Sequence, residues 1–372
     1  MAKVENISFA ENFPISFKEL EKEAEKVMGA DGFGYVQSGA GGEETLRKNI
    51  DSFAKYSIVP RMLKDVSMPD ISVNIFGKTY PYPIFLAPIG MQRLEHNEGE
   101  MASARAAASF GIPFIQSTVS SYSIEEIAST TGTSPKWFQL YWSNYEEASF
   151  SMVRRAEEAG YEAIVLTVDT VMMGWREADL RNNFSPLKLG YGKANYESDP
   201  VFMASLQDGD IVQGILNNIH HPTLSWEHIA RLKEKTSLPI LLKGILHPED
   251  AGLAVERGID GIIVSNHGGR QLDGVIAAID ALGPIAKEVK GRIPVLFDSG
   301  IRRGSDVVKA LALGADAVCL GRPYVYGLAI GGQAGVEKVL ANFIEETKVS
   351  LSLAGVGSLK DIAGLQLIRM KY

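Results

Sequence analysis

Eight short apolar runs recur along the chain, and each is followed by polar or glycine residues and then by a stretch with helical periodicity. The apolar residues within a run are continuous rather than alternating, which is typical of parallel strands buried on both faces. The runs are residues 84–90, 113–118, 136–142, 163–169, 239–245, 261–267, 294–300 and 317–323. Eight such strands alternating with helices predict an α/β fold, a (β/α)8 TIM barrel.

Two segments do not follow this repeat, and they complete the predicted organisation as one domain. An amphipathic helix over 16–28 lies in an N-terminal helical extension that precedes the barrel. Residues 183–235, after the fourth strand, are too many and too polar for an ordinary connection, and predict a long lid loop. The parts of the single domain 1–372 are the extension 1–83, the barrel 84–330 with its insertion 183–235, and a C-terminal helical segment 331–372.

Charge and cysteine content narrow the classes of partner. A formal net charge of −8 argues against nucleic acid, because phosphate backbones are bound by basic faces. Cys319 is the only cysteine, which excludes an intrachain disulfide and a cysteine metal cluster. No segment has the length of a membrane span, and residues 1–13 hold no apolar run of signal-peptide length. We therefore expect a cytoplasmic protein with no membrane partner.

Polar or glycine residues stand at the C-terminal ends of all eight predicted strands. In a barrel of this kind these ends face the active site, so together they predict a polar pocket over one mouth of the barrel. The alternative is that they only solvate the rim of the barrel. The strand-end residues are Pro88, Gly90, Ser117, Gln139, Tyr141, Thr167, Asp169, Lys243, Ser265, His267, Asp298, Gly300, Gly321 and Arg322.

The stretch SNHGGRQLD (265–273) carries the strongest chemical signal. His267 exchanges a proton near neutral pH, and a carboxylate such as Asp169 across the mouth would orient its ring. Two glycines after it leave room for a flat group against the backbone. Arg270 and Arg176 together favour a carboxylate substrate held in a bidentate manner. The alternative is a core histidine satisfied by the backbone.

The last two strands end in DSGIRRG (298–304) and LGRP (320–323). Glycines there let backbone N–H groups approach an anion, while arginines supply charge. This pattern favours a phosphate site, which barrels commonly place at these two strands. The alternative is a pair of turns that lead into surface helices.

With these motifs the chain resembles the family of FMN-dependent α-hydroxy-acid oxidizing enzymes. The resemblance covers roughly residues 30–330, and its motifs follow the order of the family. Lacking a heme domain, the chain is most similar to the lactate-oxidizing members from bacteria. The motifs are GYVQSGA (34–40), LAPIG (86–90), FQLY (138–141), LTVDT (166–170), GWREAD (174–179), LLKGI (241–245), SNHGGRQLD (265–273), FDSGIRRG (297–304) and LGRP (320–323).

The resemblance implies roles for the matching residues. His267 is the base that takes a proton from the hydroxyl or from the α-carbon of the substrate, and Asp169 stabilises its protonated form. The substrate carboxylate and hydroxyl are bound by Tyr35, Tyr141, Arg176 and Arg270, of which Tyr141 and Arg270 also count as catalytic.

The resemblance also implies FMN as the cofactor. Lys243 would stabilise the negative charge of the reduced ring. The other expected FMN contacts are Pro88, Ile89, Gly90, Ser117, Gln139, Thr167 and Ser265 at the ring, Asp298 at the ribityl chain, and Gly300, Arg302, Gly321 and Arg322 at the phosphate.

The implied reaction converts an L-2-hydroxy acid, with L-lactate as the expected substrate, to the 2-oxo acid, and O2 then becomes H2O2. A dehydrogenase that passes electrons to a quinone or another carrier, and a lactate monooxygenase, share every residue named above. An FMN barrel isomerase and a barrel that has lost catalysis are disfavoured by the intact arginine pair and base. The resemblance further implies a homotetramer.

Three further features concern the substrate pocket and the insertion. Gly90 and Val119 replace larger residues that are common in the family, which favours a pocket for substrates larger than glycolate. Tyr191 and Tyr196 are alternative lid contacts to the substrate. The adjacent His220 and His221 lack a supporting carboxylate pattern, so we expect a polar loop there and no metal.

Overall fold

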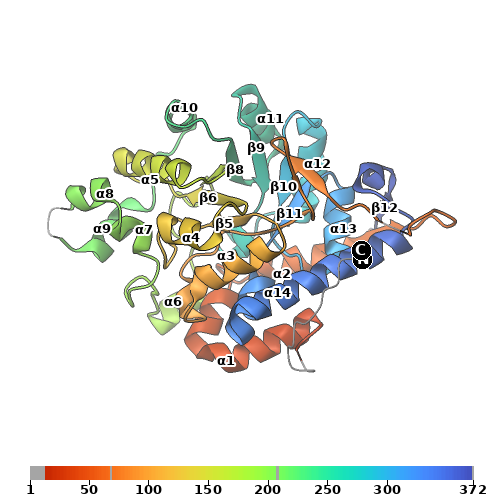
Figure 1. The fold of residues 1–372 in the computed structure, drawn as a ribbon, viewed down its shortest axis with the longest axis horizontal. Coiled ribbons are helices and arrows are strands. Elements are labelled where there is room, and N and C mark those ends of the chain that lie inside the picture. Colours follow the sequence, from red (N-terminus) through yellow and green to blue (C-terminus); the bar gives the residue numbers. More distant parts are fainter. Residues whose placement is uncertain (1–12, 68, 207–208, 371–372) are drawn as a thin grey trace.

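The computed structural model describes residues 13–67, 69–206 and 209–370, and within them eight parallel strands close into a barrel (Figure 1). The barrel order is β10-β11-β4-β5-β6-β7-β8-β9. Each of the eight predicted apolar runs contains one strand, so the predicted TIM barrel is confirmed. The strands are β4 (Ile84–Leu86), β5 (Phe114–Gln116), β6 (Lys136–Leu140), β7 (Ile164–Thr167), β8 (Ile240–Ile245), β9 (Gly261–Val264), β10 (Val295–Phe297) and β11 (Ala317–Leu320).

Helices surround the barrel and follow its strands in sequence. Local signals set their ends: Ser123 and Glu126 form a capping box at the start of α4, and Pro248 stands in the first turn of α11. The strand side chains are almost entirely buried, as continuous apolar runs require. The helices are α3 (Gly99–Ser109), α4 (Ile124–Thr131), α5 (Glu146–Glu158), α10 (Trp226–Lys233), α11 (Pro248–Glu256), α12 (Ala278–Val289), α13 (Gly304–Ala312) and α14 (Arg322–Leu353).

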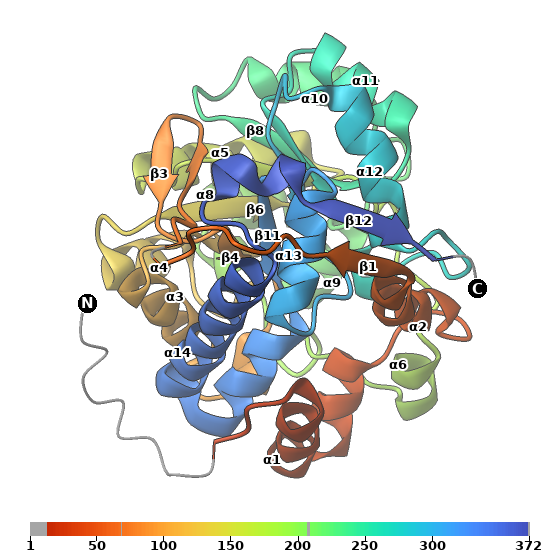
Figure 2. The ribbon, with the colours of Figure 1, turned by 90° about the vertical axis from the view of Figure 1, so that its right-hand side faces the viewer.

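The N-terminal extension reaches the mouth of the barrel through α1 (Phe17–Gln37). This helix continues past the predicted 16–28 because Gly29, with φ of 70°, joins two helical pieces across a kink. Further along, β1 (Tyr56–Val59) pairs antiparallel with β12 (Gln366–Arg369), which ties the extension to the C-terminal segment (Figure 2). The smaller elements of the extension are α2 (Glu44–Asp51), η1 (Ser52–Lys55), β2 (Val73–Ile75) and β3 (Lys78–Tyr80).

The C-terminal segment begins within a barrel helix. The eighth helix, α14, crosses the predicted boundary at residue 330, and its backbone leaves helical geometry at Gly331 and Gly332. It packs against α1, α3 and α13 (Figure 2). After it come η4 (Leu359–Gly364) and β12.

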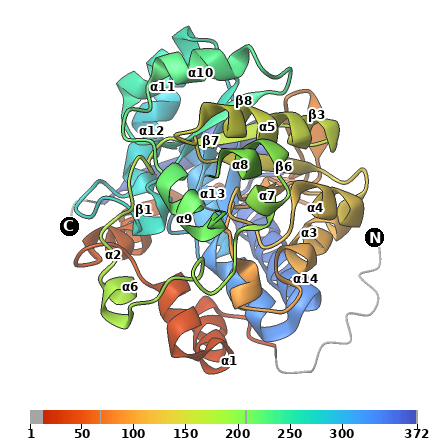
Figure 3. The same cartoon turned by 90° about the vertical axis from the view of Figure 1, so that its left-hand side faces the viewer.

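Short helices occupy much of the segment predicted as a lid loop. After α6 (Glu177–Asn182) come α7 (Ala194–Glu197), α8 (Pro200–Ser205) and α9 (Ile211–Asn218), which lie together on the face seen in Figure 3. Asp199 caps α8 by accepting bonds from two backbone N–H groups, and Asp210 caps α9. The predicted insertion also includes α10, the barrel helix before β8. Its role as a lid stays a prediction.

No helix within the described residues combines the length and apolar character needed to cross a lipid bilayer. Residues 1–12, which contributed to the expectation about a signal peptide, lie outside the described residues.

One buried acid stands out beside the barrel. Glu95 follows η2 (Gln92–Leu94), and both of its carboxylate oxygens are buried without a hydrogen-bond partner among the described residues. The oxygens face Gly32 in α1, where a Cβ atom would lie 3.1 Å from Glu95 Oε2. Burial raises the pKa of Glu95 to about 8, since nothing stabilises its charged form.

We predict that Glu95→Gln stabilises the protein in alkaline solution. Because the pKa of Glu95 is raised, the folded state keeps a proton that the unfolded state has already lost. The free energy of unfolding therefore falls as the pH rises from about 5 to about 8. The glutamine cannot ionise, and it should add on the order of a few kcal/mol to the free energy of unfolding above pH 8. Urea unfolding at pH 6 and pH 9 measures this gain. Glu25→Gln, at an exposed position of α1, is the control; equal pH dependence in the wild type and Glu95→Gln would contradict the prediction.

Candidate functional site

A cavity opens at the C-terminal ends of the barrel strands, where the sequence predicted the site. Four predicted residues do not line it: Gln139, Asp169 and Ser265 contact residues that do, and Thr167 accepts a hydrogen bond from Gln139. The predicted residues that line it are Tyr35, Pro88, Ile89, Gly90, Ser117, Tyr141, Arg176, Lys243, His267, Arg270, Asp298, Gly300, Arg302, Gly321 and Arg322.

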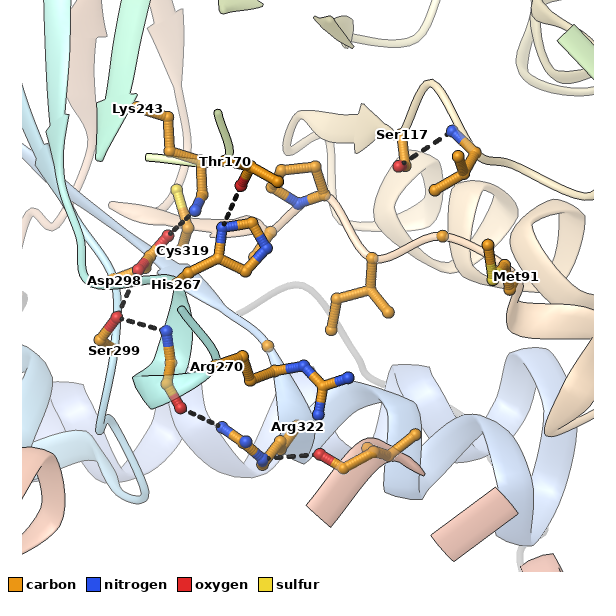
Figure 4. A pocket seen from close by; sticks show the side chains of 18 of the residues that line it. Met91, Ser117, Thr170, Lys243, His267, Arg270, Asp298, Ser299, Cys319 and Arg322 are labelled. Carbon is orange, nitrogen blue, oxygen red and sulfur yellow. Dashed lines mark hydrogen bonds and ion pairs between the residues drawn. The ribbon is translucent and has the colours of Figure 1, made fainter. Parts of the chain in front are cut away.

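His267 and Asp169 form a close pair at the cavity wall. The Nδ1 atom of His267 lies 2.9 Å from Asp169 Oδ1, and the Thr170 hydroxyl donates to the same oxygen at 2.8 Å. The Thr170 hydroxyl also lies 3.4 Å from His267 Nδ1 (Figure 4). Because the carboxylate faces Nδ1, this nitrogen carries the proton in the neutral ring and Nε2 is left as the acceptor. Sequence reasoning missed Thr170, although it stands in the LTVDT motif beside Asp169.

The protonation states of this pair suit a base. Burial, helped by the charges of Lys243 and Arg176, lowers the pKa of His267 although Asp169 opposes the shift, so the ring is neutral at pH 7. Burial by itself would raise the pKa of Asp169, but the charge and hydrogen bond of His267, helped by Lys243, lower it to about 2. An ionised carboxylate beside a neutral imidazole can stabilise the proton that the ring accepts.

The backbone around His267 is held in an unusual conformation. His267 has φ of 59°, and Gly268 and Gly269 follow with φ of 65° and 76°. Positive φ is uncommon outside glycine and clusters at functional sites. The two glycines have different surroundings: Gly268 lines the cavity, whereas a Cβ at Gly269 would lie 2.7 Å from Leu46 N in α2. The expectation that both glycines make room for a flat group is therefore wrong for Gly269, which serves helix packing.

The C-terminus of α1 holds two arginines over the barrel mouth. Arg270 Nη1 donates to the carbonyls of Tyr35 and Ser38 at 2.6 and 2.8 Å. Arg322 donates to the carbonyls of Val36 and Ser38 at 2.8 and 3.0 Å. Carbonyls at a helix C-terminus lack intrahelical partners and carry partial negative charge, which suits guanidinium groups.

Gln271 joins the loop after β9 to the loop after β7. Its Nε2 donates to the carbonyls of Asp169 and Met172, both at 3.0 Å. Its Oε1 accepts from Gly174 N and Arg176 Nη2, both at 3.3 Å. One amide thus fixes the loop that carries Asp169 and Arg176. The sequence motif contained Gln271, but no pattern assigned it this position.

Positive charge dominates the cavity. Asp298 is the only carboxylate among its lining residues. Burial and the adjacent Arg176 lower the pKa of Arg270 to about 9, and burial with Arg302 lowers that of Arg322 to about 10. The cationic side chains that line it are Arg176, Lys243, Arg270, Arg302 and Arg322. Such crowding of cations predicts anionic ligands.

Two buried hydrogen-bond chains support the cavity wall. Ser117 donates to Gln139 Oε1 at 3.1 Å, and Gln139 donates to Thr167 Oγ1 at 2.9 Å. On the other side, Lys243 Nζ lies 3.0 Å from Ser265 Oγ and 3.3 Å from Asp298 Oδ2 (Figure 4). Burial disfavours the charge of Lys243, but Asp298 and Asp169 outweigh burial and raise its pKa, so the ammonium is retained.

The expected gain of space at Gly90 is not present. A Cβ at residue 90 would lie 2.5 Å from both Cγ2 and the carbonyl oxygen of Val119. Val119 therefore fills the volume that an alanine methyl group at residue 90 would occupy. The sequence could not reveal this contact because the two residues come from different strand ends.

The insertion contributes residues other than those predicted. Tyr196 is buried and packs against Phe202 with ring centroids 4.8 Å apart, and neither Tyr191 nor Tyr196 lines the cavity. Ile219 and His220, just after α9, line it instead. Among the described residues, no three His, Cys, Asp or Glu side chains form a group that could hold a metal ion.

Residues 24–369 match the family model described as FMN-dependent dehydrogenase. The chain belongs to this family. An L-lactate oxidase of Lysinibacillus sphaericus is 59% identical over 369 residues, which cover 98% of this chain and 96% of that protein. A 4-hydroxymandelate oxidase of Amycolatopsis orientalis is 43% identical, with coverage of 92% and 95%. The family resemblance found in the sequence is therefore confirmed.

Solved structures of the FMN-dependent dehydrogenase family show the same fold. A mandelate oxidase with (S)-4-hydroxymandelic acid superposes with a TM-score of 0.89 at 41% identity, and the match covers 96% of this chain and all of that one. The same enzyme with benzoyl-formic acid gives a TM-score of 0.87. The agreement extends over nearly the whole chain.

As a member of this family, the protein uses FMN as its cofactor. Two features of the cavity fit the phosphate of FMN. The Nε atom of Arg302 is buried and has no hydrogen-bond partner among the described residues. Arg322 begins α14, whose N-terminus carries partial positive charge. An anionic phosphate would satisfy both features.

We predict that Gln271→Leu weakens binding of carboxylate ligands to the FMN-loaded protein by on the order of tenfold. The change removes the four hydrogen bonds that hold the loop of Asp169 and Arg176. Oxalate titrated against the flavin absorbance measures the dissociation constant. Leu272→Ala, at the next and largely exposed position, is the control. Wild-type affinity in Gln271→Leu would contradict the positioning role.

Proposed function

We propose that the protein is an L-lactate oxidase that converts L-lactate and O2 to pyruvate and H2O2. The observation that carries this proposal is the His267–Asp169 pair, 2.9 Å apart, in one cavity with Arg176 and Arg270. A base beside two cations suits removal of a proton from an anionic hydroxy acid. The 59% identity to an L-lactate oxidase supports lactate as the acid and O2 as the acceptor.

His267 is the proposed catalytic base. Its Nε2 would accept the proton that leaves the substrate, while Asp169 stabilises the resulting imidazolium. The lowered pKa of His267 keeps the ring neutral and ready at pH 7. Thr170 would hold the carboxylate in place through its 2.8 Å hydrogen bond.

Four side chains are proposed to bind the substrate. Arg176 and Arg270 would bind the carboxylate, because both line the cavity and their mutual repulsion is relieved by an anion. Tyr35 and Tyr141 would donate hydrogen bonds to the carboxylate and hydroxyl. Burial raises the pKa of Tyr141 to about 12, so its phenol keeps the proton that it donates.

FMN, when bound, supplies the two-electron carrier between the hydroxy acid and O2. Lys243 would hold positive charge against the ring, and Asp298 would face the ribityl chain. Arg302 and Arg322 would hold the phosphate beside Gly300 and Gly321. The remaining proposed contacts to the ring are Pro88, Ile89, Gly90, Ser117, Gln139, Thr167 and Ser265.

Anaerobic mixing with L-lactate, followed by O2, tests the reaction. The flavin absorbance should bleach with L-lactate and return rapidly with O2, with one pyruvate and one H2O2 formed per turnover. Recovery only with an artificial acceptor would assign a dehydrogenase. Acetate and CO2 in place of pyruvate and H2O2 would assign a monooxygenase.

We predict that His267→Gln keeps FMN bound but loses flavin reduction by several powers of ten, because the proton acceptor is removed. Stopped-flow absorbance under anaerobic conditions gives the reduction rate. The neutral form of His267 is the active one, and its pKa is lowered from the ordinary histidine value of 6.5. In the wild type the reduction rate should therefore decrease only when the pH is brought below 6.5. Near-normal reduction in the variant would rule out His267 as the base.

The substrate range remains open to a direct comparison. Because Val119 fills the space beside Gly90, we propose that small acids such as L-lactate are preferred over L-mandelate. Turnover on glycolate, L-lactate, L-2-hydroxybutyrate and L-mandelate measures this order. A preference for L-mandelate would contradict it.

Three further expectations are kept as proposals. The chain is proposed to form one domain, 1–372, in which part of 183–235 covers the cavity; Ile219 and His220 in its lining support this. A homotetramer is proposed from the family resemblance, and light scattering of the purified protein tests it. A cytoplasmic location is proposed from the single cysteine, and cell fractionation tests it.

A further inference from the structure

His220 brings a second imidazole into the cavity, beside that of His267. Its backbone is anchored: Asn144 Nδ2 donates to the carbonyls of Asn217 and His220 at 2.8 and 2.7 Å, and Asn144 N donates to Asn218 O at 3.0 Å. Its Nδ1 is buried and has no hydrogen-bond partner among the described residues. An imidazole that lines a ligand cavity and keeps a buried, unpaired nitrogen needs an explanation, because buried polar atoms are normally paired.

The surroundings of His220 are cationic. Burial and the charge of Arg176 lower its pKa, so the ring is neutral while the cavity lacks an anion. Among the described residues that line the cavity, Asp298 is the only carboxylate, and it forms an ion pair with Lys243 at 3.3 Å. The titratable lining groups are Tyr35, Tyr141, Arg176, Lys243, His267, Arg270, Asp298, Arg302, Cys319 and Arg322.

The next residue offers a matched comparison. The His221 ring lies 4.6 Å from the ring of His228, and His221 does not line the cavity. Outside the cavity, its nearest charged neighbours are His228, Glu146 and Arg231. The two adjacent histidines therefore have separate surroundings, although the sequence pattern treats them alike.

We propose that His220 binds the substrate carboxylate opposite Arg176 and takes up a proton as it does so. This inference rests on the proposed function only in that the cavity accepts a carboxylate. The anion supplies the negative charge that the cavity lacks, so the imidazolium and the guanidinium hold it from two sides. Binding of one anion then carries one proton with it, and affinity rises as the pH falls.

Oxalate binding to the FMN-loaded protein tests this proposal, because oxalate is a carboxylate without a C–H bond to oxidise. Flavin absorbance gives the dissociation constant between pH 6 and pH 8.5. One linked proton makes binding up to about tenfold tighter for each unit of decreasing pH. We predict that His220→Gln loses this factor while His221→Gln keeps it. Calorimetry in two buffers of different ionisation heat counts the protons taken up.

His267 could also take up a proton, and a variant separates the two rings. His267→Gln should retain the pH dependence that belongs to His220, and loss of it there would overturn the proposal. An unchanged pH dependence in His220→Gln, or its loss in His221→Gln as well, would overturn it too. If the wild type binds no oxalate at all, the proposed function itself fails, and this inference fails with it.

Discussion

The site depends on the contact between two arginines, Arg270 and Arg322, and the C-terminal end of α1. The carbonyls of Tyr35, Val36 and Ser38 lie where a helix leaves its acceptors unpaired, and they bind Arg270 and Arg322. This contact places the N-terminal extension over the barrel and keeps two guanidinium groups in a cavity that already holds other cations. Burial, and after it repulsion from Arg176, lowers the pKa of Arg270, and an anionic cofactor and an anionic substrate would relieve that repulsion.

The barrel brings the proposed base and its carboxylate together. β7 and β9 lie on either side of β8, so Asp169 after β7 can meet His267 after β9 at one mouth of the barrel. The positive φ of His267 is tolerated because its neighbours over-determine it: Asp169 holds the ring, and Gly269 packs against α2. Gln271 completes the arrangement by fixing both loops to each other. These contacts orient the imidazole of His267, the proposed base, within the cavity wall.

The insertion after β7 contains the short helices α7, α8 and α9 rather than loop alone. Caps at Asp199 and Asp210 explain the local order. The insertion contributes His220 to the cavity, whereas Tyr196, one of the two tyrosines predicted as a substrate contact, is buried against Phe202. The polar composition of the segment predicted a loop, because short capped helices contain too few apolar positions to give a clear helical periodicity.

The sequence by itself determined the eight strands, their order and the residues at their ends, because continuous apolar runs and the polar residues after them are local signals. It also placed His267, Asp169 and the arginines at one mouth, since parallel strands end on the same side of a barrel. Only the tertiary structure decided which side chains touch. Val119 fills the space beside Gly90, Gly269 packs on α2, and His220 rather than Tyr191 lines the cavity. These contacts join segments far apart in the chain, and their distances depend on packing that no local pattern encodes.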